Sequence, residues 1–214
     1  MEEKLLHGTT TVGVVYQEGV VLVADKRTSK GYEVANKRTE KVKKISDHMA
    51  ITVAGLVSDT QLFTKMIKAQ LALLNIRKGK EPTIKEGANL LASMAYQNIR
   101  RPSMVPGIVG FLLGGVDKYG PHLYEIGVDG SISEAEDYLT TGSGSRVAVG
   151  VLETLYKKDM SKDDAIELGV KAINAAIQRD LATGNGIDVI LITKDGVKKV
   201  MSEEIDTNIK KTFK

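Results

Sequence analysis

Three consecutive threonines follow a glycine near the start of the chain, in residues 8–13 (GTTTVG). Taken alone, this β-branched run is typical of an edge strand. A threonine hydroxyl is a poor nucleophile unless a base lies beside it, and a threonine at a free chain terminus supplies its own α-amine as that base. Such an amine has an unperturbed pKa of about 7.7–8.0, so that part of it is neutral near pH 7. The segment is therefore either an edge strand or a nucleophile that must be released by cleavage.

The sequence gives little support for a cysteine, metal, serine-triad or nucleotide site. The chain has no cysteine, which excludes disulfides, cysteine-ligated zinc and cysteine nucleophiles. Its histidines, His7, His48 and His122, lack the spacing of a metal motif, no G-x-S-x-G elbow accompanies them, and we expect each at the surface. Residues 141–145 (TGSGS) lack the lysine of a P-loop, so we expect a tight turn that caps the following helix and not a nucleotide site.

Composition and charge are those of a soluble globular protein. With 214 residues, of which 42% are hydrophobic, one large domain is expected. Thirty basic and 27 acidic residues are too balanced to indicate nucleic-acid binding, and we interpret Lys210, Lys211 and Lys214 as a solvated helix face. The longest apolar run, 105–116, is too short to span a bilayer, and residues 1–8 are not a secretory signal. We expect no membrane partner and a cytoplasmic location.

The elements that must position any active residues begin with strands. Residues 12–16 and 20–24 flank a glycine-containing turn, which predicts a hairpin. Residues 20–24 (VVLVA) are apolar on both faces, which is typical of a strand covered on both sides. Further strands are predicted at 43–46, 49–54, 108–116, 122–128, 189–193 and 197–201.

Helices are predicted in two pairs, with a last polar helix at the end of the chain. Apolar residues recur at helical spacing in 63–74 and 84–95, and Thr83 with Glu86 forms a capping-box signature. The second pair is expected at 145–156 and 161–179. Because strands and helices are grouped and do not alternate, we predict an α+β fold with two packed antiparallel sheets and helices outside.

The chain resembles archaeal proteasome β subunits, which are N-terminal-nucleophile hydrolases, over residues 8–206. Each matching segment is weak alone, but their order and spacing are specific together. The segments are GTTTVG at 8–13, VVLVADKR at 20–27, EKVKKI at 40–45, AGLVSD at 54–59, LLGGVD at 112–117, TGSGS at 141–145, GVLE at 150–153 and QRDLATGNG at 178–186. The resemblance implies a four-layer αββα sandwich of two antiparallel sheets.

The resemblance also implies a precursor. Thr9 matches the nucleophile, and residues 1–8 match a propeptide that is removed autocatalytically, leaving 9–214 as a single peptidase domain. Gly8 suits the cut because a residue without Cβ permits the strained bend that attack requires. Thr10 and Thr11 are local competitors, but the family pattern selects the first threonine after the glycine. Before cleavage Thr9 has no free amine, so the site of the uncut chain is expected to be incomplete.

Six further catalytic roles follow from the resemblance. As plain charges, Lys41 and Asp25 would be surface residues; in the family, the matching lysine activates the nucleophile and the matching acid holds that lysine. Gly55, otherwise a turn glycine, matches the backbone donor to the oxyanion. Ser143 and Asp180 match residues that orient the new terminus and relay protons. The family most often has serine where this chain has Thr183, which keeps the hydroxyl and adds a methyl group.

The implied substrate is an unfolded polypeptide bound as an extended strand. Backbone groups around Ser29, Gly55 and Val57 would pair with it, and one side-chain pocket would set specificity. The pocket positions of the family fall on Thr28, Val53 and Val57, with Lys43 near the rim. Val53 at the base indicates medium apolar side chains before the cut, and Lys43 would admit acidic ones.

The implied assembly is a stack of seven-membered rings. Its partners are other β subunits, α subunits that enclose the β rings, and an ATP-dependent unfoldase beyond them. No cofactor or metal is implied for the peptidase step. Two alternatives stay open, a non-catalytic structural subunit of the ring and a β subunit that matures only beside a sister β subunit. Another N-terminal-nucleophile amidohydrolase fits the later segments less well.

Overall fold

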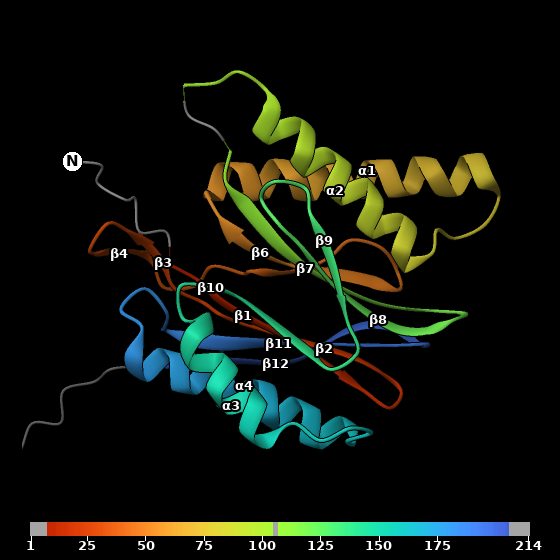
Figure 1. Ribbon diagram of the computed structural model, residues 1–214. Coiled ribbons are helices and arrows are strands. Elements are labelled where there is room, and N and C mark those ends of the chain that lie inside the picture. Colours follow the sequence, from red (N-terminus) through yellow and green to blue (C-terminus); the bar gives the residue numbers. More distant parts are fainter. Residues whose placement is uncertain (1–7, 105–106, 206–214) are drawn as a thin grey trace, which may run out of the picture.

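The structure is a computed structural model that describes residues 8–104 and 107–205. Within these residues, two five-stranded antiparallel sheets pack face to face between two pairs of helices (Figure 1). The helices α1 (Val57–Lys78) and α2 (Ile84–Arg100) cover one sheet, and α3 (Ser145–Leu155) and α4 (Lys162–Arg179) cover the other. The prediction of a four-layer αββα sandwich is therefore confirmed.

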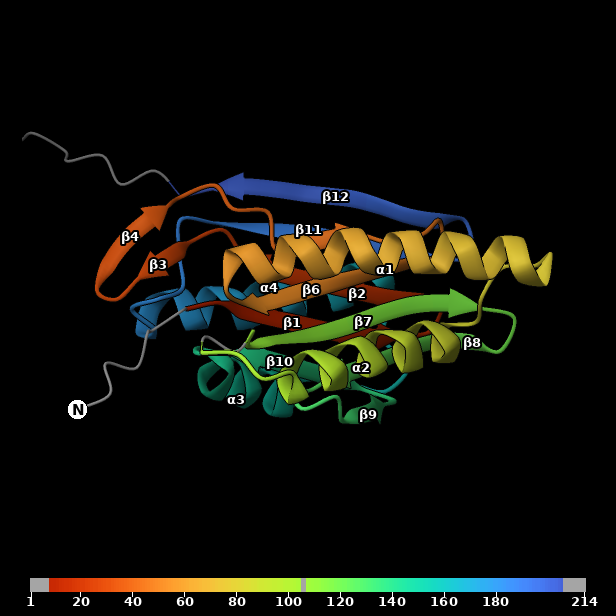
Figure 2. The same ribbon diagram turned by 90° about the horizontal axis from the view of Figure 1, so that it is seen from above.

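The first sheet has the strand order β10-β1-β2-β11-β12, and the second has the order β5-β6-β7-β8-β9. The strands of the first sheet are β1 (Thr10–Tyr16), β2 (Gly19–Asp25), β10 (Tyr138–Gly142), β11 (Gly186–Thr193) and β12 (Gly196–Glu204). Those of the second are β5 (Val42–Lys44), β6 (Met49–Gly55), β7 (Val109–Asp117), β8 (Gly120–Ile126) and β9 (Ile132–Ala135). A separate hairpin of β3 (Thr28–Lys30) and β4 (Glu33–Asn36) projects from one end of the sandwich (Figures 1 and 2).

Three hydrophobic clusters fill the three interfaces between the four layers. One joins α1 and α2 to β6, β7 and β8, and a second joins α3 and α4 to β1, β2 and β11. The third lies between the sheets and includes Leu22, Val42 and Leu112, none of which is more than 1% exposed. The strand β2 contributes to two clusters, because Val21 and Val23 face the helices while Leu22 faces the other sheet. Its apolar character on both faces thus has the predicted cause.

The predicted strands and the two predicted pairs of helices are confirmed, with ends that shift by a few residues. Thr83 and Glu86 form the expected capping box, and Gly144 is the N-cap of α3, as the turn interpretation of residues 141–145 requires. Four strands escaped prediction, namely β3, β4, β9 and β10. Each has at most five residues, and only one of their side chains, Ser29, is buried, so none has a clear pattern of alternation.

Three other expectations need comment. Two histidines expected at the surface are half-buried and have partners: His48 Nε2 lies 2.9 Å from the Pro82 carbonyl oxygen, and His122 Nδ1 lies 3.0 Å from Glu134 Oε1. His7 and residues 206–214, where the last helix is expected to end the chain, lie outside the described residues, and β12 extends to Glu204. None of the helices in the described part of the chain is long and apolar enough to cross a membrane.

Candidate active site

The candidate residues meet at one end of the two sheets. Thr9 directly precedes β1, Asp25 ends β2, and Lys41 directly precedes β5. Ser143 lies between β10 and α3, and Asp180 caps the end of α4. The strand register explains this convergence, because Thr10 pairs with Gly142 and Asp25 pairs with Ile187. Segments that are far apart in the sequence thus end side by side.

Thr9 lies against the carbonyl group that precedes it. Its Oγ1 donates a hydrogen bond of 2.7 Å to the Gly8 oxygen, and its side chain is nearly buried. The Thr9 N–H donates to Ser143 Oγ at 3.4 Å, while the Gly8 N–H donates to Ser29 Oγ at 3.2 Å. Because Thr9 N is an amide nitrogen within the chain, it cannot act as a base.

The neighbouring threonines have their hydroxyls engaged elsewhere. Thr10 and Thr11 are fully buried. Thr10 Oγ1 lies 2.6 Å from Thr183 Oγ1, and Thr11 Oγ1 lies 2.8 Å from Thr141 Oγ1 while accepting a bond from Thr52 Oγ1 at 3.0 Å. Thr9 therefore differs from its two local competitors in that its hydroxyl contacts the carbonyl group of the preceding residue.

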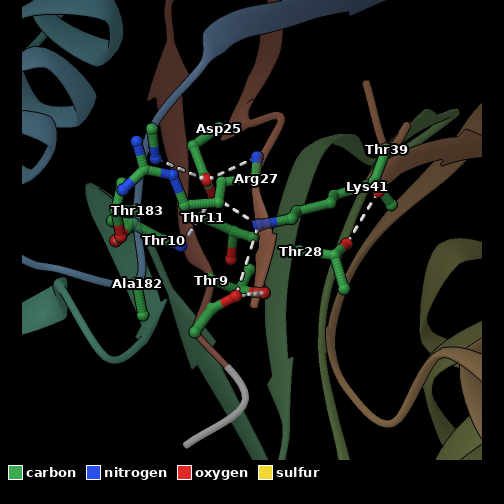
Figure 3. A network of polar contacts seen from close by, with 12 residues as sticks. Thr9, Thr10, Thr11, Asp25, Arg27, Thr28, Thr39, Lys41, Ala182 and Thr183 are labelled. Carbon is green, nitrogen blue, oxygen red and sulfur yellow. Dashed lines mark hydrogen bonds and ion pairs between the residues drawn. The ribbon is translucent and has the colours of Figure 1, made fainter. Parts of the chain in front are cut away.

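A buried ion pair lies beside this contact. Lys41 Nζ donates to Asp25 Oδ1 at 2.6 Å and to the Gly8 oxygen at 3.5 Å, so that the lysine reaches between the acid and the Gly8–Thr9 segment (Figure 3). The Lys41 side chain is 4% exposed, and that of Asp25 is fully buried. Asp25 also accepts N–H bonds from Thr10, Arg27 and Gly184 at 2.9 to 3.0 Å. Four donors thus compensate the desolvation of a carboxylate that would otherwise be costly to bury.

Burial lowers the pKa of Lys41 below that of an ordinary lysine. The charge of Asp25 and its hydrogen bond oppose this effect, as does the charge of Asp180, while the charge of Arg27 adds to it. The site therefore holds an ammonium group that gives up its proton more readily than one in water. Such a group can stabilise negative charge on a nearby oxygen.

Ser143, Asp180 and Thr183 form a second polar chain. Ser143 Oγ donates to Asp180 Oδ2 at 2.6 Å, and Thr183 Oγ1 donates to the same oxygen. Each hydroxyl has one hydrogen, and both Thr183 and Ser143 use theirs to bond Asp180. In the contact between Thr10 and Thr183, Thr10 is therefore the donor, and Ser143 accepts from the Thr9 N–H. The added methyl group of Thr183 leaves this chain of bonds intact, and the residue is fully buried.

Gly55 lies outside this side-chain network, at the end of β6. Its φ of +147° is in the region that favours glycine, and a Cβ there would lie 2.1 Å from the Ile108 carbonyl oxygen. The backbone at this point therefore requires glycine for its own conformation. The sequence gives Gly55 two interpretations, a turn glycine and a backbone donor to the oxyanion. The positive φ and the nearby Ile108 oxygen explain why glycine is needed at this position without reference to catalysis.

The four predicted pocket residues line one cavity of about 630 Å³, namely Thr28, Lys43, Val53 and Val57. Thr28 Oγ1 donates to Thr39 Oγ1 at 2.7 Å, and Thr39 also lines the cavity. Ser29 does not line it. Ser29 instead borders a smaller cavity of about 120 Å³ with Gly8, Ser143 and Asp180. The predicted substrate-binding residues thus lie on β3, on β6 and at the start of α1, and they border two different cavities.

Sequence reasoning missed several partners in the site. Thr10 was considered only as a rival to Thr9, and Arg27, Thr39, Glu40 and Gly184 were not considered. Alternation along a strand was a usable signal for Thr10, because its side chain must point away from those of its neighbours. The N–H donors of Arg27 and Gly184 left no signal, since any residue but proline supplies one.

Comparisons with known proteins identify the family of the chain. A family model described as "Proteasome subunit" matches residues 5–192. The chain is 43% identical over 206 residues to proteasome subunit beta of Archaeoglobus profundus, which covers 96% of this chain and 94% of that protein. It is 42% identical over 211 residues to proteasome subunit beta of Ferroglobus placidus, covering 99% of each. It is also 43% identical over 204 residues to proteasome subunit beta 2 of Cenarchaeum symbiosum, covering 95% of each. The chain therefore belongs to the proteasome subunit family, and its similarity to archaeal beta subunits extends over nearly its whole length.

Proposed function

We propose that this chain is a catalytic β subunit of a proteasome core particle, a threonine endopeptidase that activates itself by cleavage between Gly8 and Thr9. The observation that carries the proposal is the meeting of the Thr9 hydroxyl and the Lys41 ammonium group at one carbonyl oxygen. The Gly8 oxygen accepts from Thr9 Oγ1 at 2.7 Å and from Lys41 Nζ at 3.5 Å, and Asp25 holds the lysine from the other side at 2.6 Å.

Self-cleavage follows from this arrangement. The Thr9 hydroxyl oxygen attacks the Gly8 carbonyl carbon, and Lys41 stabilises the negative charge that develops on the carbonyl oxygen. The C–N bond breaks, the nitrogen takes up the proton that the Thr9 hydroxyl has given up, and Gly8 is left as an ester on the Thr9 oxygen. Water then hydrolyses the ester and yields residues 1–8 with a free Gly8 carboxylate. Residues 9–214 keep a free Thr9 amine.

The same groups serve peptide hydrolysis afterwards. The new amine accepts the proton of the Thr9 hydroxyl as that oxygen attacks a substrate carbonyl. Ser143 Oγ accepts a hydrogen bond from the Thr9 nitrogen, so it is placed to orient the amine after cleavage. Asp180 in turn holds Ser143 by accepting its hydroxyl hydrogen. The backbone N–H of Gly55 is assigned to the oxyanion, and no cofactor or metal is needed for this step.

The proposed substrate is unfolded polypeptide, with the side chain before the cut in the cavity lined by Thr28, Val53 and Val57. Ser29, Gly55 and Val57 would pair with its backbone. The proposed partners are other β subunits and α subunits in stacked seven-membered rings, with an ATP-dependent unfoldase beyond the α ring. The names of the relatives, proteasome subunit beta, support this assembly.

A second candidate is a β subunit that matures only beside a sister β subunit. Two relatives are named proteasome subunit beta 2, from Cenarchaeum symbiosum and Nitrosopumilus maritimus, which favours β subunits of more than one type in some relatives. A non-catalytic structural subunit is the third reading. It is disfavoured because Thr9 and Lys41 both contact the Gly8 carbonyl oxygen and Asp25 holds Lys41.

The deciding experiment is the intact mass of the chain after co-assembly with its α subunits. We expect the wild type to lose residues 1–8 and Thr9→Ala to keep them, while Thr9→Ser, which retains a hydroxyl, still loses them. Retention in the wild type would contradict self-activation. Adding sister β subunits then separates the two alternatives, because only a sister-dependent subunit would be cut after that addition.

A further inference from the structure

Glu40 is the only acidic side chain among the residues that line the 630 Å³ cavity, and three lysines line it as well. Its Oε2 accepts from Lys43 Nζ at 2.9 Å. Glu40 directly precedes Lys41, and Lys43 lies two residues after it, within β5. Lys43, which the sequence indicated as a positive group at the rim, thus already has a negative partner within the cavity wall.

A second contact fixes the Glu40 carboxylate from outside the cavity. Its Oε1 lies 3.4 Å from Lys199 Nζ on β12, and the same Lys199 nitrogen lies 3.0 Å from Asp188 Oδ1 on β11. Asp188 is 1% exposed, so this end of the chain of charges is anchored in the first sheet. The carboxylate is therefore held between two ammonium groups and is less free than an isolated surface glutamate.

The ionised state of Glu40 is favoured. Partial burial raises the pKa of Glu40, but the hydrogen bonds and charges of Lys43 and Lys199 outweigh it, and the net effect lowers the pKa. Glu40 is therefore negative at neutral pH. The pair that it forms with Lys43 is close to neutral as a whole.

We propose that Glu40 is a specificity-determining residue, which cancels the charge of Lys43 at the rim and so favours apolar over acidic side chains in this cavity. The proposal rests on the proposed peptidase function. A bound substrate displaces water from the cavity, so a charge on its wall acts more strongly on the substrate than it would in solvent. With Glu40 in place, an acidic side chain gains little from Lys43; without it, the lysine is free to pair with the substrate.

The test measures kcat/KM on two fluorogenic peptides that differ only in having glutamate or leucine before the cut. We expect Glu40→Gln to raise the glutamate-to-leucine ratio by about three- to tenfold. Lys43→Met should lower the ratio, because Glu40 then stands without its partner, and the double variant should return to within about twofold of the wild type. Glu167→Gln is the matched control, since Glu167 pairs with Lys171 at 2.6 Å on α4 and does not line this cavity.

If Glu40 had only a structural role, Glu40→Gln would change kcat/KM for both peptides by the same factor. A ratio that stays within twofold of the wild type in Glu40→Gln overturns the proposal. If that variant does not assemble, Lys43→Met alone decides, because a ratio that is unchanged or higher overturns the proposal as well. A wild type that keeps residues 1–8 and cleaves neither peptide refutes the peptidase function and this inference together. A wild type that cleaves peptides with a preference indifferent to Glu40 refutes only the inference.

Discussion

The three threonines at positions 9 to 11 have the same side chain, and their neighbours give each hydroxyl a different use. Thr11 bonds to Thr52 and Thr141, and so ties together strands of both sheets. Thr10 contacts Thr183 on the other face of β1. Thr9 alone of the three contacts a main-chain carbonyl that a hydroxyl could attack. Thr9, the proposed nucleophile, is thus distinguished from Thr10 and Thr11 by its surroundings and not by its residue type.

The hydroxyl of Thr183 gives the first prediction at this scale. Thr183→Val keeps the shape but leaves the buried Thr10 hydroxyl without its partner and removes one of the donors to Asp180, so we expect a loss of about 1–3 kcal/mol in the free energy of unfolding. Release of residues 1–8 should slow by at least about tenfold. Thr183→Ser keeps the hydroxyl and should cleave within roughly threefold of the wild type. Time courses of intact mass measure the rates, and cleavage of the valine variant at the wild-type rate would exclude a role for this hydroxyl.

The lowered pKa of Lys41 predicts the pH dependence of the mature peptidase. Peptide cleavage should rise as the Thr9 amine loses its proton, at about pH 7.7–8.0. It should then fall as Lys41 loses its own proton, with a midpoint below the ordinary lysine value of 10.5. Between the lowered pKa of Lys41 in the folded state and the ordinary value, the folded state binds fewer protons than the unfolded state, so the contribution of Lys41 to stability increases with pH. Loss of stability through Lys41 therefore does not explain the decrease in the rate of peptide cleavage. Rates of peptide hydrolysis across the pH range, with circular dichroism as the control, test this. A falling limb only at or above pH 10.5 would contradict it.

The candidate residues could be named from the sequence only through the family resemblance. Thr9 and Ser143 are 134 positions apart, and Thr10 and Thr183 are 173 apart. No periodicity reports contacts over such separations. The contacts follow instead from strand pairing, which brings Gly142 beside Thr10 and Ile187 beside Asp25. The catalytic roles of these residues remain predictions.

At the scale of elements, length and burial decide what a sequence reveals. The strand β2 has seven residues, all buried, and its apolar run predicted it directly. The hairpin of β3 and β4 is short and mostly exposed, and it stays close to the polar composition of a loop. Yet these short strands help to form the candidate site, since Thr28 and Ser29 lie on β3. One of the elements that the sequence did not predict, β3, therefore carries two of the candidate residues.

Two glycines of positive φ, Gly55 and Gly79, allow the cost of backbone strain to be compared with the cost of a steric clash of an added Cβ. Gly55, with φ +147°, has the Ile108 oxygen 2.1 Å from where a Cβ would lie, whereas Gly79, with φ +63°, has open space around it. We expect Gly55→Ala to cost about 3 kcal/mol or more of folding free energy, because the backbone must move. Gly79→Ala should cost only about 1 kcal/mol, the strain of a left-handed residue. Urea unfolding measures both, and equal losses would show that the contact at Gly55 is relieved without cost.

At the scale of the whole molecule, the site draws on both sheets. The first sheet carries Thr9 at the start of β1 and Asp25 at the end of β2, and Asp180 follows α4, which covers that sheet. Lys41 instead directly precedes β5 of the second sheet. The Lys41–Asp25 pair therefore bridges the two sheets. Its geometry depends on the hydrophobic cluster between them, which contains Val42, the residue after Lys41.

Two leucines test whether this dependence is specific. Leu112 lies in the cluster between the sheets, and Leu91 lies in the cluster between α2 and the second sheet; both are fully buried. Changing either to alanine should cost about 2–5 kcal/mol in the free energy of unfolding. Only Leu112→Ala should also slow release of residues 1–8, by roughly tenfold, because a shift between the sheets of about 1 Å displaces Lys41 from Asp25 and Gly8. Rates are compared at a temperature where both variants are fully folded. If Leu91→Ala slows release equally, the site responds to global stability, and the packing between the sheets has no special part in positioning Lys41.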